Sequence, residues 1–511
     1  MLARVQSFVL TGIDASRCEV EIDVASGAMP GERIVGLPDA AVKESLERVR
    51  SAIANTGYSF PLGRVVVNLA PADVRKEGPV YDLPMALGLL VSSGSLRAGE
   101  GGIDLRDALV AGEVALDGRL RPVRGVLAMT LLARKLGVGC VLVPEENATE
   151  AAMVEGVEVY AARTLAEVVG LISGQIPAEP VPPVDVASLL AETEAAVDFA
   201  DIKGQEGVKR AATVAAAGAH NLLMLGPAGT GKTMIAKALP GIMPRLSVAE
   251  AIEVTRVYSA AGLLCADHDA QGRIITRRPV RSPHHTASVA AIVGGGTIPR
   301  PGEITLAHHG ILFLDELPEF PRDALETMRQ PLEDGWVTIA RAHSTVRFPA
   351  RVMVVAAMNP TPQGDMPTNH TSRRAMNRYL SRISGPLIDR IDIHVEAPAV
   401  PWKRLSETGA RGVGTEALRG QVLAARARSR ARQEDEPNAR LSGRRLDELA
   451  PMEPAAKGLL GQAMRELGLS ARAYDKIRRL ARTIADLEGA EVLTSAAIAE
   501  AVQYRLLDRR V

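Results

Sequence analysis

One short segment constrains the fold more than any other part of the chain. The run GPAGTGKT follows the apolar stretch NLLMLG, which predicts a buried strand, and leads into TMIAKAL, which predicts a helix. Backbone N–H groups of such a glycine-rich turn, together with the helix N-terminus, bind phosphates. We therefore expect an ATP site in which the lysine holds the β- and γ-phosphates and the last threonine coordinates Mg²⁺. The residues concerned are Gly226, Pro227, Ala228, Gly229, Thr230, Gly231, Lys232 and Thr233.

Two further apolar strands end in polar residues. ILFLDE ends in Asp315 and Glu316, and RVMVVAAMN ends in Asn359. In parallel sheets ligands bind at the carboxyl ends of the strands. We expect Asp315 to bind Mg²⁺ and Glu316 to activate the attacking water, which favours hydrolysis over a kinase-like transfer. Asn359 contacts the γ-phosphate or the water in one interpretation, and is a turn residue before Pro360 in the other.

A proline-rich stretch, residues 174–198, divides the chain. Its four prolines disfavour helix and central strand, so we predict a linker. Strands and helices alternate before it, apolar strands typical of a parallel sheet follow it, and helices dominate from about residue 416. The fold class is therefore α/β, with a helical domain at the end of the chain. The predicted domains are 1–173, the linker 174–198, 199–400 and 401–511.

Composition excludes several classes of protein. Sixty basic residues balance 60 acidic ones, so any contact with nucleic acid depends on local patches. The cysteines Cys18, Cys140 and Cys265 are too far apart for a disulfide scaffold or a cysteine zinc site. No apolar run is long enough to span a membrane, and the first residues do not form a signal peptide. We expect a cytoplasmic protein.

Longer stretches carry a family resemblance. RSPHHTASVAAIVGGGTIPRPGEITLAHHGILFLDELPEF, YLSRISGPLIDRIDIHVE and SARAYDKIRRLARTIADLEG resemble the AAA+ ATPases, specifically the magnesium-chelatase-like branch and its ComM family. The resemblance implies a homohexameric ring. It also implies that Arg390 is an arginine finger given in trans to a neighbour's ATP, and that Arg472 is the second sensor arginine of a helical lid. Without the resemblance, surface salt bridges explain both arginines better.

The sequence also predicts insertions in the ATPase core. Lys232 and Asp315 are 83 residues apart, which exceeds the needs of a minimal core. WVTIARAHSTVRFPA predicts a hairpin. In similar ATPases such insertions enter the pore and contact DNA; the alternatives are packing and contact between subunits. Basic loops track phosphates without reading sequence. The candidate DNA-binding residues are Arg341, His343 and Arg347.

Three other features are less specific. The pairs His284–His285 and His308–His309 suggest a metal, but zinc needs three or four convergent ligands, so we disfavour it. Relatives carry cysteines after the sensor asparagine, whereas TPQG follows Asn359–Pro360 here, so no zinc knuckle is expected. The run RGQVLAARARSRARQ spaces its arginines around a helix, which favours an exposed face over a phosphate-tracking surface.

The first domain resembles the proteolytic domain of Lon proteases, which has a ribosomal-protein-S5-domain-2-like fold. The serine position of Lon lies in a run that reads Gly78–Pro79–Val80–Tyr81–Asp82 here, and the lysine position is Met129. Because valine has no nucleophile and methionine is no base, we expect no proteolysis. The remaining roles are a scaffold for the ring or a platform for DNA.

Taken with its resemblance, the sequence predicts an ATP- and Mg²⁺-dependent motor that acts on single-stranded or branched DNA. By resemblance it is a helicase that drives branch migration during natural transformation, with other recombination proteins as possible partners. A magnesium-chelatase motor subunit and a protein-remodelling chaperone stay open as alternatives. Stimulation of the ATPase activity by forked DNA distinguishes the DNA motor from the chelatase subunit and the chaperone.

Overall fold

The computed structural model describes residues 2–25, 29, 31–97, 101–264, 274–296, 299–341, 344–361, 379, 381–401, 412–505 and 507. The chain forms two compact units. Unit 1 comprises Met1–Leu189 and Ser247–Thr276, and unit 2 comprises Leu190–Leu246 and Arg277–Val511. The segment Ser247–Thr276, which follows the glycine-rich loop in sequence, therefore packs with the N-terminal part of the chain. In the described helices, none is both long and apolar enough to cross a membrane.

Unit 1 is built on a mixed sheet of seven strands in the order β3-β4-β2-β1-β5-β8-β9. Strand β4 (Arg64–Ala70) reads RVVVNLA, and its alternate residues are buried, as expected for a sheet with one face on the core. Helix α3 (Asp82–Ser92) is apolar on nearly all sides and packs on β1 and β2. The other strands of this sheet are β1 (Leu2–Thr11), β2 (Asp14–Ala25), β3 (Gly31–Val35), β5 (Ala108–Val110), β8 (Cys140–Pro144) and β9 (Glu158–Ala162), while β6 (Glu113–Val114) and β7 (Leu120–Arg121) pair as a separate hairpin.

Helix α10 (Val248–Ala261) completes unit 1 and packs against α4 (Val126–Leu136). Gly125, at the start of α4, has a φ of 79° and its N–H donates to Ser259 Oγ over 3.1 Å. A capping box at Ser247 and Glu250 fixes where α10 begins. The remaining helices of this unit are α1 (Ala40–Lys43), α2 (Ser45–Asn55), α5 (Ala148–Ala151), α6 (Leu165–Ser173) and α7 (Val186–Leu189), the last within the proline-rich stretch.

Unit 2 contains a parallel sheet of five strands in the order β11-β14-β17-β10-β18. The three predicted apolar strands are confirmed as β10 (Leu222–Leu225), β14 (Ile311–Leu314) and β17 (Met353–Met358), and all their residues are buried. The predicted helix after the glycine-rich loop is confirmed as α9 (Lys232–Ala238). The edge strands β11 (Val280–Arg281) and β18 (Ile393–Glu396) were not predicted: β11 has only two residues, and β18 reads IHVE, which is not a continuous apolar run.

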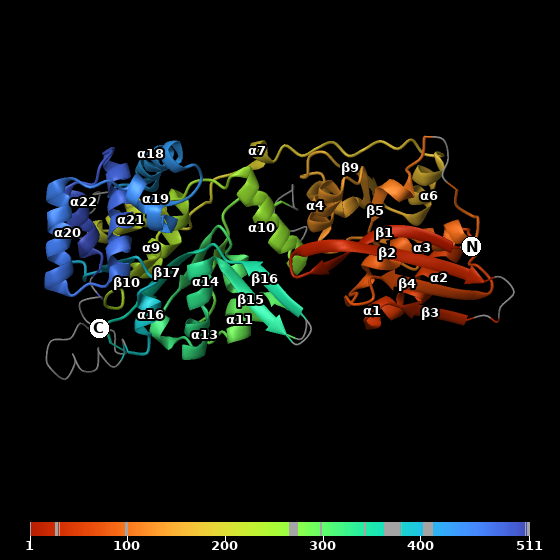
Figure 1. Cartoon of the computed structure of the whole chain (residues 1–511), viewed down its shortest axis with the longest axis horizontal. Coiled ribbons are helices and arrows are strands. Elements are labelled where there is room, and N and C mark those ends of the chain that lie inside the picture. Colours follow the sequence, from red (N-terminus) through yellow and green to blue (C-terminus); the bar gives the residue numbers. More distant parts are fainter. Residues whose placement is uncertain are drawn as a thin grey trace. The chain divides into compact units, whose positions relative to one another are not determined.

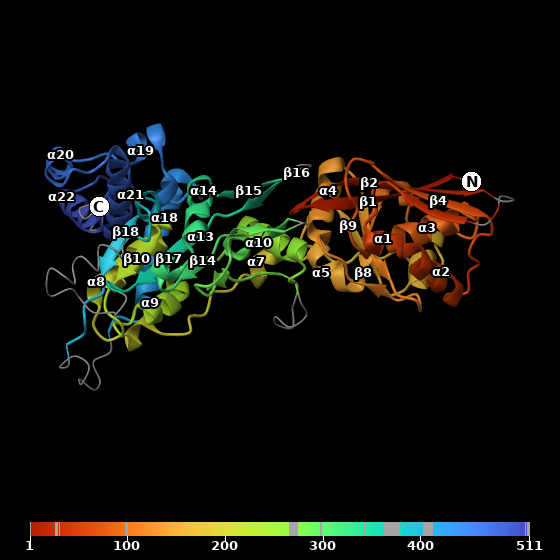
Figure 2. The same cartoon turned by 90° about the horizontal axis from the view of Figure 1, so that it is seen from below.

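Helices and hairpins flank this sheet. Helix α8 (Glu206–Gly218) leads into β10, and the predicted hairpin is confirmed as β15 (Trp336–Arg341) paired with β16 (Ser344–Pro349). The C-terminal helices gather beside β10 and β17 in both views (Figures 1 and 2). They are α18 (Thr415–Gln433), α19 (Gly443–Leu449), α20 (Pro454–Leu467), α21 (Ala471–Glu488) and α22 (Ser495–Gln503). The short elements are α11 (Val289–Val293), β12 (Gly294–Gly295), β13 (Arg300–Pro301), α12 (Glu303–Leu306), α13 (Arg322–Thr327), α14 (Arg329–Asp334) and α16 (Gly385–Ile388).

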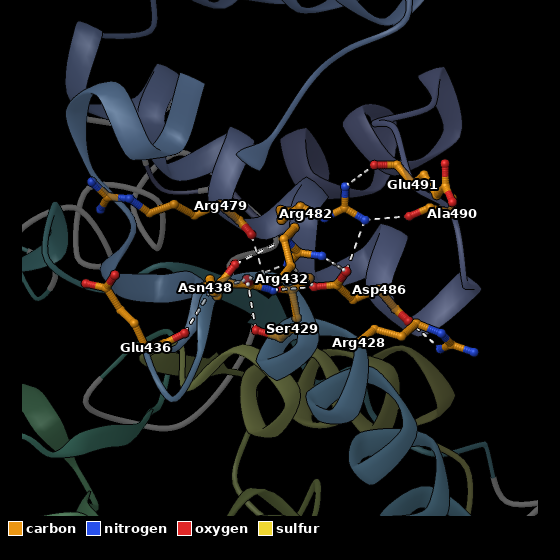
Figure 3. Close-up of polar contacts among 12 residues, drawn as sticks. Arg428, Ser429, Arg432, Glu436, Asn438, Arg479, Arg482, Asp486, Ala490 and Glu491 are labelled. Carbon is orange, nitrogen blue, oxygen red and sulfur yellow. Dashed lines mark hydrogen bonds and ion pairs between the residues drawn. The ribbon is translucent and has the colours of Figure 1, made fainter. Parts of the chain in front are cut away.

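A buried carboxylate joins α18 to α21 (Figure 3). Asp486 is 2% exposed and accepts two hydrogen bonds of 2.8 Å from Arg432 and one of 3.0 Å from Arg482, which is 1% exposed. Asn438 donates a fourth over 2.8 Å. The prediction of an exposed arginine face is therefore wrong for Arg432, because its guanidinium turns inward to neutralise a buried charge.

Candidate functional site

Strand register brings the predicted phosphate-binding and carboxylate residues to one edge of the unit 2 sheet. Leu225 of β10 pairs with Met358 of β17, so the glycine-rich loop and Asn359 leave the sheet side by side. Leu314 of β14 pairs with Ala356, which brings Asp315 to the same edge. The strands are parallel, so all three of these segments meet at the carboxyl edge, where open α/β sheets bind ligands.

The loop between β10 and α9 needs its glycines. A Cβ on Gly226 would lie 2.2 Å from the carbonyl oxygen of Ala397, and Gly229 and Gly231 have φ values of 77° and 89°. These conformations strain residues with a Cβ and let backbone N–H groups face a bound phosphate. Gln205 Nε2 also donates to the carbonyl of Thr230 over 3.1 Å. Nothing in the sequence pattern pointed to this contact, which spans 25 residues.

Lys232 lies at the centre of the edge. Its Nζ donates to the carbonyls of Gly226 and Pro227, over 2.7 and 2.8 Å, and to Asn359 Oδ1 over 3.1 Å. Burial lowers the pKa of Lys232, and the carboxylate of Asp315 partly offsets that effect. The ammonium group and the Asn359 amide therefore lie together at the end of the glycine-rich loop, a placement suited to binding a phosphate group.

Asp315 and Thr233 form the candidate Mg²⁺ position. Thr233 Oγ1 donates to Asp315 Oδ2 over 2.9 Å. Hydroxyl and carboxylate oxygens are the hard ligands that Mg²⁺ prefers next to substrate phosphates. The donor set therefore fits this ion, which these two side chains would hold together with the phosphates.

Glu316 follows in an exposed, left-handed turn with a φ of 54°. Its side chain is 52% exposed, and His285 Nδ1 lies 3.3 Å from Glu316 Oε2. His285 belongs to the segment after β11, so the insertion reaches the carboxylate that we expect to activate water. The sequence suggested a metal or a contact with DNA for His285, and no local pattern indicated its pairing with Glu316.

Arg390 lies at the amino ends of the strands, on the side of the sheet opposite the glycine-rich loop. Ile393, three residues later, pairs with Leu222, the first residue of β10, and the Arg390 carbonyl accepts from Asn221 Nδ2 over 3.0 Å. Four strand residues, about 13 Å, thus separate Arg390 from the loop that follows β10. Its guanidinium binds Glu333 and the carbonyl of Arg329. Arg390 therefore does not reach the phosphate-binding loop of its own chain.

Arg472 is exposed in the first turn of α21. Two contacts locate this helix: Lys476 Nζ lies 3.0 Å from Asp392 Oδ1, and Thr483 Oγ1 lies 2.8 Å from His220 Nε2. Asp392 precedes β18 and His220 precedes β10, so α21 follows the amino edge of the sheet. Arg472, one turn before Lys476, is brought to the side that carries Arg390.

The candidate DNA-binding residues are only partly described. Arg347 is exposed on β16, opposite Thr338 of β15. His343 and the side chain of Arg341 lie outside the described residues. In the predicted insertion between Lys232 and Asp315, at about residues 277–303, Arg281 binds both carboxylate oxygens of Glu303, over 2.6 and 2.8 Å. Arg281 therefore has a structural partner, whereas Arg347 is presented to solvent.

The remaining histidines of the two pairs contact neighbouring residues of the fold, and the residue at the lysine position of Lon is buried. His308 Nδ1 accepts from the N–H of Arg351 over 3.1 Å, and the N–H of His309 donates to the carbonyl of the same residue. His284 Nδ1 lies 2.9 Å from Thr286 Oγ1. In unit 1, Met129 is fully buried in α4.

Family models match most of the chain. The model described as magnesium chelatase, subunit ChlI, matches residues 198–405, its C-terminal model matches 412–505, and the model described as subunit ChlI of Mg-chelatase matches 20–147. These matches together with the α/β fold support an ATPase role of the AAA+ type.

Two curated relatives match nearly the full length of this chain, and a third matches part of it. Competence protein ComM of Haemophilus influenzae is 42% identical over 99% of this chain and 98% of its own length, and the protein YifB of Escherichia coli is 40% identical over the same shares. The magnesium-chelatase 38 kDa subunit of Cereibacter sphaeroides is 25% identical over 45% of this chain and 72% of that protein. The chain thus belongs to the ComM/YifB family of magnesium-chelatase-like AAA+ proteins.

Proposed function

We propose that this protein is an ATP-hydrolysing motor that assembles into a homohexameric ring, moves DNA through it and promotes branch migration during recombination. The observation that carries the proposal is the separation of Arg390 from the phosphate-binding loop of its own chain. An arginine on the far edge of the sheet completes an ATP site only when a second copy of the chain supplies it.

Each group of the site has a role in hydrolysis. Lys232 binds the β- and γ-phosphates, and Thr233 and Asp315 would hold Mg²⁺, which neutralises phosphate charge when bound. Glu316 accepts a proton from the attacking water, and Asn359 orients that water or the γ-phosphate. Arg390 and Arg472 of the neighbouring subunit stabilise the charge of the transition state; such an arginine contributes about 10³–10⁵ to the rate in related NTPases.

DNA as the substrate rests on other observations. Arg347 is exposed on the β15–β16 hairpin, and flexible basic loops follow a phosphate backbone without reading its sequence. Arg341 and His343 of the same hairpin are proposed to assist. The similarity to a competence protein favours a role in the uptake and integration of DNA in the cytoplasm. Residues 1–173 are proposed to form a Lon-like domain without its catalytic pair, serving as a scaffold.

A strand-separation assay tests the proposal. Wild-type protein is mixed with ATP, Mg²⁺ and either forked DNA or a four-way junction, and Glu316→Gln serves as the hydrolysis-deficient control. We expect the wild type to separate strands and the variant to bind ATP without doing so. ATPase activity that forked DNA does not stimulate, but that unfolded protein or a chelatase partner does, would instead favour the remodelling or chelatase alternatives.

A further inference from the structure

A buried ion pair joins α21 to the segment that carries Arg390. Lys476 Nζ lies 3.0 Å from Asp392 Oδ1, and the two side chains are 11% and 10% exposed. Asp392 stands two residues after Arg390, and Lys476 stands one helical turn after Arg472. The pair therefore links the short segments that carry the two arginines.

The segment from Arg390 to Asp392 is held by its backbone as well. Asn221 Nδ2 donates to the carbonyl of Arg390 over 3.0 Å. Arg505 donates to the carbonyl of Ile391 over 2.6 Å and to that of Asp392 over 3.3 Å. Three successive carbonyls are thus bound by side chains of the core and of the C-terminal region, which leaves the segment little freedom to move alone.

Asp392 is a charged group in a poorly solvated place. Burial favours its neutral form, but Lys476 and His220 outweigh burial and hold the pKa of Asp392 well below its usual range. His220 Nδ1 is 3.6 Å from Asp392 Oδ2, and the N–H of Asn221 donates to the same oxygen over 3.2 Å. A buried charge of this kind depends on its partners, and removal of one partner leaves it uncompensated.

Helix α21 is continuous between Arg472 and Lys476, a rise of about 6 Å. A helix turn of this length is stiff, so the position of Lys476 sets that of Arg472. Lys476 is also fixed to Asp392 by the ion pair. The two segments that carry Arg390 and Arg472 therefore move as one body. Arg390 does not reach the phosphate-binding loop of its own chain, and Arg472 lies on the same side of the sheet, so the two arginines are placed to serve one neighbouring subunit.

We infer that Lys476 is a positioning residue for hydrolysis in the neighbouring subunit: through Asp392 it holds Arg390 in register with Arg472, so that both arginines reach one ATP together. This inference rests on the proposed function, in which ATP is hydrolysed between two subunits. Lys476 itself does not contact ATP.

Mixed rings of full-length chains test the inference. A Lys232→Ala subunit lacks a working phosphate-binding loop but offers its arginines, and an Arg390→Ala subunit has a working loop but no finger. Mixing the two restores ATPase activity at the sites between them. Lys476→Met is then placed on one subunit type at a time.

We expect Lys476→Met to lower the restored ATPase activity by about 10²-fold when it is on the Lys232→Ala subunit, which is the cost of misplacing a catalytic group by about 1 Å. On the Arg390→Ala subunit it leaves the restored activity unchanged. A merely structural ion pair would lower the activity equally from either side, and that result would overturn the inference.

Further variants separate positioning from folding. The double variant Lys476→Met with Asp392→Asn removes both charges and leaves no buried charge unpaired, and it should show the same asymmetry. Lys476→Arg retains a cation and should restore most of the activity. Arg478→Met is the matched control, because Arg478 is buried on the same helix but binds Asp447 and the carbonyl of Leu446 instead; it should show no asymmetry.

The mixture without any Lys476 substitution shows whether the proposed function or only the role of Lys476 is wrong. If Lys232→Ala and Arg390→Ala subunits restore no activity together, the shared site is wrong and this inference fails with the proposed function. If they restore activity, and Lys476→Met lowers it equally on both subunit types, only the role of Lys476 is wrong.

Discussion

Replacement of Asp486 by asparagine should destabilise the packing of the C-terminal helices, and it should lower the unfolding free energy more than the same replacement at an exposed aspartate. The carboxylate accepts four hydrogen bonds of 2.8 to 3.0 Å, three of them from Arg432 and Arg482. Asparagine has one acceptor oxygen, and its NH₂ group would face a guanidinium. Arg482, which is 1% exposed, would then be a buried charge without a counter-ion.

The expected magnitude follows from burial. Removing one partner of a buried pair costs about 3–5 kcal/mol of unfolding free energy. The matched control is Asp435→Asn, because Asp435 pairs with Arg430 at the surface, where the side chains are 78% and 52% exposed. Exposed pairs contribute about 0.2–1 kcal/mol, so the control should change little.

Urea unfolding followed by helical circular dichroism measures both variants, and hydrogen exchange in α18 and α21 locates the effect. We expect Asp486→Asn to accelerate exchange in these two helices and Asp435→Asn to leave it unchanged. If both variants lie within about 1 kcal/mol of the wild type, the buried carboxylate does not hold the helices together and the reasoning is wrong.

Three further predictions concern the site and its pH dependence. Lys232→Ala should abolish ATP binding, measured with a fluorescent ATP analogue, because it removes the cation that meets the phosphates; unchanged affinity would contradict the assignment. Glu316→Gln should retain ATP binding while turnover falls, measured by phosphate release, and normal turnover would exclude Glu316 as the base. Burial lowers the pKa of His394 well below its usual value, so the folded chain keeps it neutral while the unfolded chain takes up a proton below about pH 6.5. Stability should therefore fall as the pH drops from 7.5 to 5.5, by up to about 1.4 kcal/mol per pH unit for this residue, and His394→Gln should reduce that slope in urea titrations.

Much of the ATPase core was predictable because its signals are local. The glycine-rich loop, the strand before it and the helix after it are contiguous, and the apolar runs of β10, β14 and β17 are long enough to identify. Strand β11 was missed because it has only two residues, and β18 was missed because its sequence, IHVE, mixes apolar and polar residues instead of forming an apolar run. The Gln205–Thr230 and His285–Glu316 contacts were missed because they join distant segments.

Sequence alone thus determined the chemistry that the chain offers: phosphate-binding glycines, Lys232, and carboxylates at the ends of buried strands. Those features depend on residue type and on neighbours in the chain. Tertiary structure alone decided which arginines face solvent, which are buried in pairs and which lie far from the chain's own loop. Arg390 and Arg432 look alike in sequence, and only strand register and helix packing separate the first from its own ATP site and turn the second toward Asp486.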